Sequence, residues 1–100
     1  MIIVLGKFVF RKPISDDVRA RLGELAQAVR ERHAGNFDYR LSIDTDDARV
    51  LRLMERWDEL QSFVKHGATP EVAALVALVS PDTTESTEVM RYEIASEARV

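Results

Sequence analysis

Apolar residues occupy most positions of both alternating sets over the first ten residues, as in a strand that is buried on both faces. The segment contains no break before Lys12-Pro13, which ends it. The pattern therefore predicts a central strand over Ile2–Phe10. One face carries Ile2, Val4, Phe8 and Phe10, and the other carries Ile3, Leu5 and Val9.

A helix is predicted after this strand. Ser15 is a suitable N-cap, and apolar residues follow at spacings of four, three and four residues, which places them on one side of a helix. Gly35-Asn36 then breaks the chain. His33 falls in the last turn, and we expect its side chain to face solvent. The apolar stripe consists of Val18, Leu22, Leu25 and Val29.

Two strands joined by a turn come next. The segment from Phe37 to Ile43 alternates apolar and polar residues, with Phe37, Tyr39, Leu41 and Ile43 on the apolar side, which is typical of an edge strand with one wet face. Val50–Trp57 is rich in residues that suit a half-buried strand. The carboxylates of the turn between them lack the glycine and glutamate of a calcium loop, so we expect no metal site there.

Two short helices and a final strand complete the chain. Asp58 and Gln61 have the spacing of a capping box, and Gly67 is a suitable left-handed residue after the first of these helices. Thr69-Pro70 opens the second helix, whose expected apolar stripe is Val72, Leu75, Val76 and Val79. The last strand is predicted over Thr87–Ala95, and its Tyr92 is expected in the core.

This order of elements predicts a single α+β domain over residues 1–100. Its compact form is a ferredoxin-like four-stranded antiparallel sheet, with the first and third strands central and the helices on one face. The second apolar face of Ile2–Phe10 then has no cover within the chain. Exposing this face to water would lose several kcal/mol of hydrophobic stabilisation, at about 25 cal/mol per Å² of apolar surface. We therefore expect a homodimer in which two sheets pack face to face.

Composition narrows the classes of function. The chain is 46% hydrophobic and 31% charged, with a net charge of −3, and its basic residues alternate with acids. These values indicate an ordinary globular domain and argue against a nucleic-acid partner. The chain has no cysteine, which excludes thiol chemistry and thiolate metal sites. We expect a cytoplasmic protein without a membrane partner, since Met1–Leu5 is too short to span a bilayer.

One constellation resembles a known family. Glu55-Arg56-Trp57-Asp58, followed by Phe63, His66 and Thr69-Pro70, is similar to the motif of the antibiotic biosynthesis monooxygenases. The resemblance extends over nearly the whole chain, and it implies a dimeric α+β barrel. It also implies a monooxygenase without cofactor, acting on a quinol, phenolic or polyketide-type aromatic molecule, in which an electron-rich substrate anion reduces O₂ directly.

The same resemblance suggests site residues, each of which also has a structural explanation. His66 is a candidate base, although a helix C-terminus alone favours a protonated imidazole there. Trp57, Phe63 and Tyr39 are candidate walls of an aromatic pocket, or simply core residues. The haem-degrading members of the superfamily need an Asn in the first strand, a Trp in the short helix and a His ligand in the next helix, and the matching positions in this chain are Gly6, His66 and Val76. Valine cannot ligate iron, so we expect no haem.

Two other functions fit the same scaffold. A non-catalytic module that binds a small ligand, or an interaction module, needs the same fold and dimer but no base. A lactone isomerase or cyclase likewise needs no cofactor. The sequence does not separate these alternatives.

Overall fold

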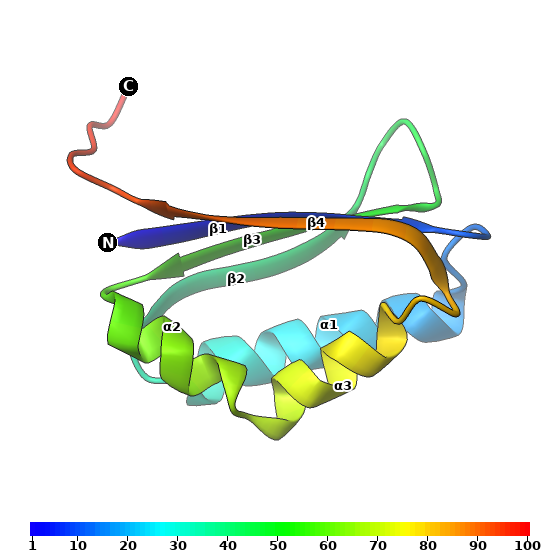
Figure 1. Ribbon diagram of the computed structural model, residues 1–100, viewed down its shortest axis with the longest axis horizontal. Coiled ribbons are helices and arrows are strands. Elements are labelled where there is room, and N and C mark those ends of the chain that lie inside the picture. The colour runs from blue at the N-terminus through cyan, green and yellow to red at the C-terminus, as the bar shows by residue number, and fades with distance from the viewer.

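The computed structural model describes all 100 residues and contains the elements in the predicted order. The chain alternates between strands and two helical connections, as in a ferredoxin-like domain, and the helices lie on one side of the strands (Figure 1). In chain order the elements are β1 (Ile2–Phe10), α1 (Asp16–Arg32), β2 (Asn36–Ile43), β3 (Val50–Trp57), α2 (Leu60–Gly67), α3 (Pro70–Leu78) and β4 (Thr84–Glu93).

The four strands form one antiparallel sheet in the order β2-β3-β1-β4. The predicted central position of β1 and β3 and the edge position of β2 are therefore confirmed. The register places Glu55 of β3 opposite Val4 of β1 on one side and opposite Tyr39 of β2 on the other. These three side chains consequently share one row across the sheet, on the same face.

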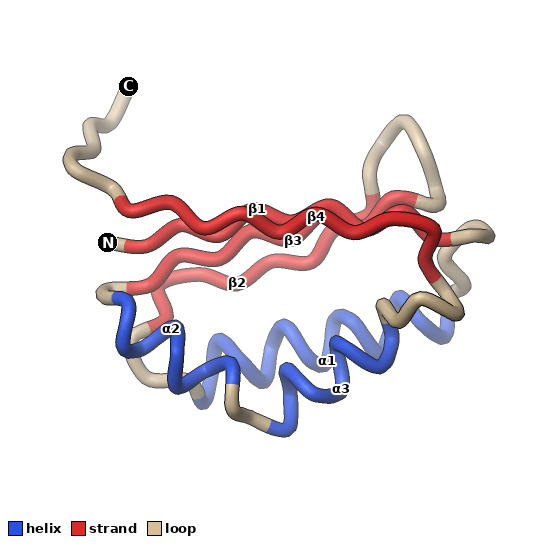
Figure 2. The backbone as a smooth tube through the Cα atoms, viewed as in Figure 1, coloured by secondary structure: helices blue, strands red, loops and turns tan.

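All three helices cover one face of the sheet, and the other face is bare (Figures 1 and 2). The covered face and the helices enclose the hydrophobic core, to which β1, α1, β2, β3 and α3 all contribute. On the bare face Leu5, Met90 and Tyr92 are 44–47% exposed. The placement of Tyr92 in the core is therefore wrong for the single chain. None of the helices has the length and apolar character that crossing a membrane requires.

Helix α1 forms as its sequence predicts. The Ser15 hydroxyl accepts a hydrogen bond from the Val18 backbone N–H, which satisfies one of the free donors of the first turn. The residues that the helix buries against the sheet are Leu22, Leu25, Ala26 and Val29.

Helix α2 begins and ends differently from the prediction. Its N-cap is Glu59, and no side chain caps it, so the expected capping box is wrong. The Asp58 carboxylate instead accepts from the neighbouring Glu59 N–H, at 2.7 Å. Gly67 is the last helical residue and has no positive φ; the left-handed glycine is Gly35, at φ 82°.

Gly35 links the turn between α1 and β2 to the turn between β3 and α2. Its carbonyl accepts from the Asp58 N–H at 2.9 Å, so the α1–β2 turn lies directly against the β3–α2 turn. A Cβ atom on Gly35 would collide with the side chains of Ser62 and Asp58. Only glycine allows this approach, and both its missing side chain and its left-handed backbone are needed.

Three further expectations are corrected. On α3 the buried residue is Leu75, whereas Val76 is 61% exposed, because the helix turns Ala74 and Leu78 toward the core instead. Phe37 is 57% exposed, because the register of β2 shifts between Asn36 and Asp38 and breaks the alternation. The last strand starts at Thr84, three residues before the expected start.

Candidate functional site

Trp57 ends β3 with its side chain completely buried. Its indole N–H donates a hydrogen bond to Oε1 of Glu55, at 2.9 Å. Residues two apart on a strand face the same way, which brings both side chains to the helix-covered face. The expected core position of Trp57 is confirmed, and the partner that its N–H needs is a carboxyl group.

His66 lies in the last turn of α2 and packs over this pair. Its ring centroid is 4.6 Å from that of Trp57, and its Nε2 is 3.4 Å from Glu55 Oε1. The residue is only 5% exposed. A buried carboxyl group and a buried imidazole thus face each other where β3 and α2 meet.

Two aromatic side chains complete the surroundings of His66. Tyr39, on β2, is 2% exposed, and its ring centroid is 5.4 Å from His66. Phe63, one turn earlier on α2, is 6.2 Å from His66 and 6.3 Å from Trp57 between centroids. Burial, and then the nearby Glu55, raise the pKa of the Tyr39 phenol above its ordinary value.

His33 also belongs to this cluster, so its predicted exposure to solvent is wrong. It is the C-cap residue of α1. Its Nδ1 lies 2.7 Å from Nδ1 of His66, and its Nε2 lies 3.3 Å from Oε1 of Glu71, near the start of α3. The His33 side chain is only 7% exposed.

Burial sets the charge states of the central pair. Removal from water raises the pKa of Glu55 to about 7, although the Trp57 hydrogen bond acts in the opposite direction. Removal from water, and then His33, lower the pKa of His66 to about 4. The protonated His66 expected from the helix dipole is therefore wrong: desolvation outweighs the dipole. At neutral pH the imidazole is uncharged and Glu55 is close to half-protonated.

The pKa of Glu71 shifts in the direction opposite to that of Glu55. Its own backbone N–H at the start of α3, and then His33, hold the pKa of this carboxyl group below its usual range. Glu71 therefore remains a carboxylate next to His33.

The structure brings together all four residues that the sequence suggested: Trp57, Phe63, Tyr39 and His66. They pack against one another as core side chains. From the sequence, Glu55 was part of the family motif but had no assigned role, His33 was expected in solvent, and Glu71 had no role. Glu55 could have been found, because it shares an inward-facing strand position with Trp57. The other two could not, since the His33–His66 contact joins positions 33 residues apart.

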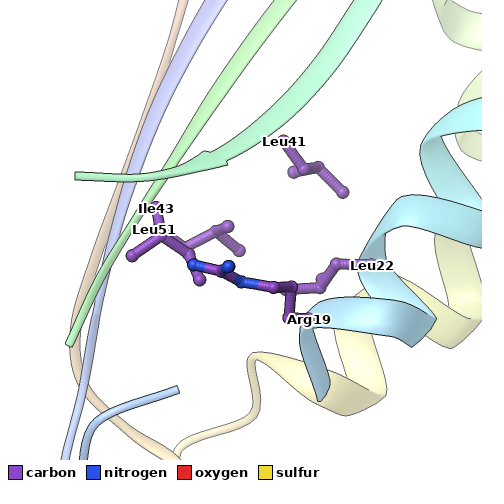
Figure 3. A pocket seen from close by; sticks show the side chains of 5 residues that line it. All are labelled: Arg19, Leu22, Leu41, Ile43 and Leu51. Carbon is purple, nitrogen blue, oxygen red and sulfur yellow. The ribbon is translucent and has the colours of Figure 1, made fainter. Parts of the chain in front are cut away.

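A cavity of about 230 Å³ lies between α1 and the sheet (Figure 3). Arg19 reaches from α1 toward Ile43 and Leu51, so one guanidinium group stands against an otherwise apolar lining. No carboxylate of the chain pairs with Arg19, in contrast to Arg21, which contacts Glu24 at 3.4 Å. The cavity is lined by Arg19, Leu22, Leu41, Ile43 and Leu51.

The fold and this cluster define a class: a small ferredoxin-like α+β domain with a buried acid–imidazole pair beneath its helices. The model of the antibiotic biosynthesis monooxygenase family matches residues 1–78, and the chain belongs to this family. The match covers every element from β1 to α3.

Solved structures with the same fold cover 91–100% of the chain. A provisionally named antibiotic biosynthesis monooxygenase from Deinococcus radiodurans is 26% identical, with a TM-score of 0.84 over 100% of this chain and 98% of that one. Protein SO0527 from Shewanella oneidensis is 25% identical, with a TM-score of 0.78 over 91% and 87%. Rv0793 from Mycobacterium tuberculosis, at 22% identity, has the same fold, with a TM-score of 0.80 over 98% of both chains. No curated protein sequence matches the chain.

Proposed function

We propose that this protein is a cofactor-independent monooxygenase that acts on a quinol, phenolic or polyketide-type aromatic molecule. The observation that carries the proposal is the buried pair of Glu55 and His66, whose facing atoms are 3.4 Å apart. A base works best when its pKa lies near the operating pH, and burial raises the pKa of Glu55 to about 7. Membership of the monooxygenase family agrees with this chemistry.

The reaction needs only a base, a dry site and O₂. The pair removes one proton from an acidic C–H or O–H group of the substrate, which leaves an electron-rich anion. This anion passes one electron to O₂, and the two radicals join through a new C–O bond. Return of the proton gives a hydroperoxide, and loss of water, which takes the remaining hydrogen of the oxygenated carbon, converts this carbon to C=O. One oxygen atom thus enters the product and the other leaves as water.

The cavity in Figure 3 is the proposed place for the substrate rings. Its apolar lining suits an aromatic body, and the unpaired Arg19 guanidinium suits the negative charge that develops on deprotonation. Ile43, Leu41 and Tyr39 occupy successive inward positions of β2, about 7 Å apart. The row that contains Tyr39 and Glu55 is therefore one such step from Leu41, and Trp57 and Phe63 enclose the far side of the base.

The working form is proposed to be a homodimer that pairs the bare sheet faces. Leu5 and Met90 are nearly half exposed at the centre of that face. The arginines around them are already matched within the chain: Arg52 contacts Asp44 at 3.3 Å and Arg56 contacts Glu97 at 3.6 Å. Burying this apolar centre against a second copy would therefore leave no unpaired charge from either arginine.

Oxygen consumption with a panel of anthrones, quinols and phenols tests the proposal. The wild-type protein should consume one O₂ per product without added flavin or metal. Glu55→Gln, which keeps the shape and the Trp57 hydrogen bond but removes the base, should reduce kcat by about 10²–10⁴-fold. His66→Ala and Trp57→Phe should also reduce turnover.

The outcomes separate the proposal from its alternatives. Saturable binding of the aromatic panel without O₂ consumption would indicate a non-catalytic ligand-binding module. Product formation without O₂ consumption, from a lactone or an open-chain precursor, would indicate an isomerase or cyclase. An unchanged kcat in Glu55→Gln would rule out the assigned base.

A further inference from the structure

Four titratable side chains from four different elements form a continuous line from the core to the surface. Glu55 Oε1 lies 3.4 Å from His66 Nε2, the two Nδ1 atoms of His66 and His33 are 2.7 Å apart, and His33 Nε2 lies 3.3 Å from Glu71 Oε1. We propose that this line is a proton relay through which the buried Glu55 exchanges protons with solvent at Glu71. The inference rests on the proposed function for its purpose, but not for its test.

The donors and acceptors along the line fit one arrangement of protons. The Glu71 carboxylate accepts from His33 Nε2–H, which leaves His33 Nδ1 as an acceptor. His66 must then donate from Nδ1, so its Nε2 carries a lone pair that faces Glu55. A protonated Glu55 supplies the missing donor. Every group is satisfied with both imidazoles uncharged.

Two linked transfers move a proton outward along this line. The Glu55 proton passes to His66 Nε2, while the His66 Nδ1 proton passes to His33 Nδ1. His66 ends with one proton, as it began. Glu55 becomes a carboxylate that still accepts from Trp57, and His33 carries two protons beside the Glu71 carboxylate. The extra proton then leaves through Glu71 to water, and the reverse sequence restores the start.

The exposure of the four side chains increases toward one end of the line. Side-chain exposure is 5% at Glu55 and 4% at His66, then rises to 7% at His33 and 15% at Glu71, so only the outer end meets water. A doubly protonated His66 is disfavoured by its burial, which agrees with its role as a neutral carrier.

Few other charged groups face the line. Arg32 of α1 lies 4.0 Å from Glu71 and keeps that end anionic. The Tyr39 phenol packs beside His66, and burial holds its proton in place. Arg30 is directed to the backbone carbonyl of Tyr39, at 2.7 Å, rather than to any member of the line.

The relay assigns positioning roles to His33 and Glu71, which lie outside the proposed contact with substrate. His33 holds the tautomer of His66 that presents a lone pair to Glu55, and Glu71 in turn holds the tautomer of His33. A neutral side chain that only fills the space of His33 would keep the packing but could not carry a proton inward or outward.

The test is the rate at which the His66 Nδ1 proton exchanges with water, measured by ¹⁵N NMR on the full chain. His33→Gln can still accept from His66 Nδ1–H but cannot relay, and exchange should slow by about tenfold or more. Glu71→Gln, at the exposed end, should slow it in the same direction without disturbing the core. Glu31→Gln, on the outer side of α1 and bonded only to Gln27, is the matched control and should leave exchange unchanged.

Turnover supplies a second readout. In His33→Gly the kcat should fall with KM unchanged, and free imidazole in the buffer should restore it in a concentration-dependent way. Exchange at His66 that is equally fast in the wild type, His33→Gln and Glu71→Gln would overturn the relay, even in an active enzyme. Slow exchange in these variants, with no O₂ consumption by the wild type, would keep the relay and remove the oxygenase proposal.

Discussion

The indole N–H of Trp57 donates to Oε1 of Glu55, two residues earlier on the same strand. This bond accounts for two unusual features at once: a fully buried tryptophan whose polar group is satisfied, and a carboxyl group in the core of a chain of 100 residues. The same oxygen atom faces His66. The pH dependence of stability therefore reports on the site.

The pair should make stability insensitive to pH over an intermediate range. Folding moves the pKa of Glu55 from 4.5 to about 7 and that of His66 from 6.5 to about 4. Between pH 4.5 and pH 6.5 the unfolded chain holds one proton, on His66, and the folded chain holds one, on Glu55. Because both states bind the same number of protons, the free energy of unfolding does not change with pH in this range. Above pH 6.5 the folded state binds more protons, so stability falls as the pH rises toward 7.

Glu55→Gln should reveal the pH dependence of stability that His66 alone produces. The amide can accept from Trp57 and donate to His66, so it imitates the protonated acid. With one titrating group left, the free energy of unfolding should rise by about 3 kcal/mol as the pH increases from 4 to 6.5. Urea unfolding of the variant and the wild type across this range measures the difference, and other groups cancel. Parallel pH profiles would contradict the assigned charge states.

Two glycines offer a matched pair for stability. Gly35→Ala places a Cβ against Asp58 and Ser62 at a φ of 82°, and it should cost about 1–3 kcal/mol while loosening the contact between the two site loops. Gly23→Ala, on α1 with no atom within 4 Å of the added carbon, should instead stabilise by roughly 0.5–1 kcal/mol. Thermal unfolding of both variants measures these changes, and a neutral Gly35→Ala would show that the turn relaxes.

The bare sheet face should control assembly. The wild type is expected at twice its 11.3 kDa mass in light scattering after size exclusion. Leu5→Lys places a charge at the centre of the face and should yield monomers at micromolar concentration. Val76→Lys, at a more exposed residue on the helical side, should leave the dimer intact. A folded wild-type monomer, or monomers from both variants, would contradict pairing through the sheet.

Arg19 should control affinity for anionic aromatic ligands. Arg19→Gln removes the guanidinium from the cavity of Figure 3 and should weaken binding of a phenolate-type ligand by about tenfold, with little effect on a neutral analogue. Arg21→Gln, whose arginine pairs with Glu24 on the same helix, should bind as the wild type does. Titration calorimetry with both ligands makes the comparison. Equal losses for the two ligands would point to a packing effect.

Local patterns predicted those elements whose apolar positions repeat at one period. The apolar run of β1 and the helical stripe of α1 predicted both elements, the stripe also predicted most of the buried face of α1, and Ser15 predicted the helix start. Errors arose where a tertiary contact outweighed the local signal. Gly67 has the features of a left-handed cap, yet it is an ordinary last residue of α2, and the left-handed glycine is Gly35, whose carbonyl accepts from the Asp58 N–H across two loops.

The site also combines residues that a local pattern relates with residues that only tertiary contacts bring together. The spacing of Glu55, Trp57, Phe63 and His66 is fixed within 12 consecutive residues, and it carries the family motif. His33 and Glu71 come from α1 and α3, and no periodicity relates them to this segment. Their alignment depends on how the two helices pack, which a local pattern does not encode.

The sequence by itself determined the order of strands and helices, the central place of β1 and the apolar character of both its faces, because these follow from residue spacing along one segment. Only the tertiary structure decided that Glu55 is buried beside His66, that His33 turns inward and that Arg19 stands over a cavity. The reason is physical: charge state and hydrogen-bond partner depend on which distant side chains displace water, and that is fixed only when the helices close over the sheet.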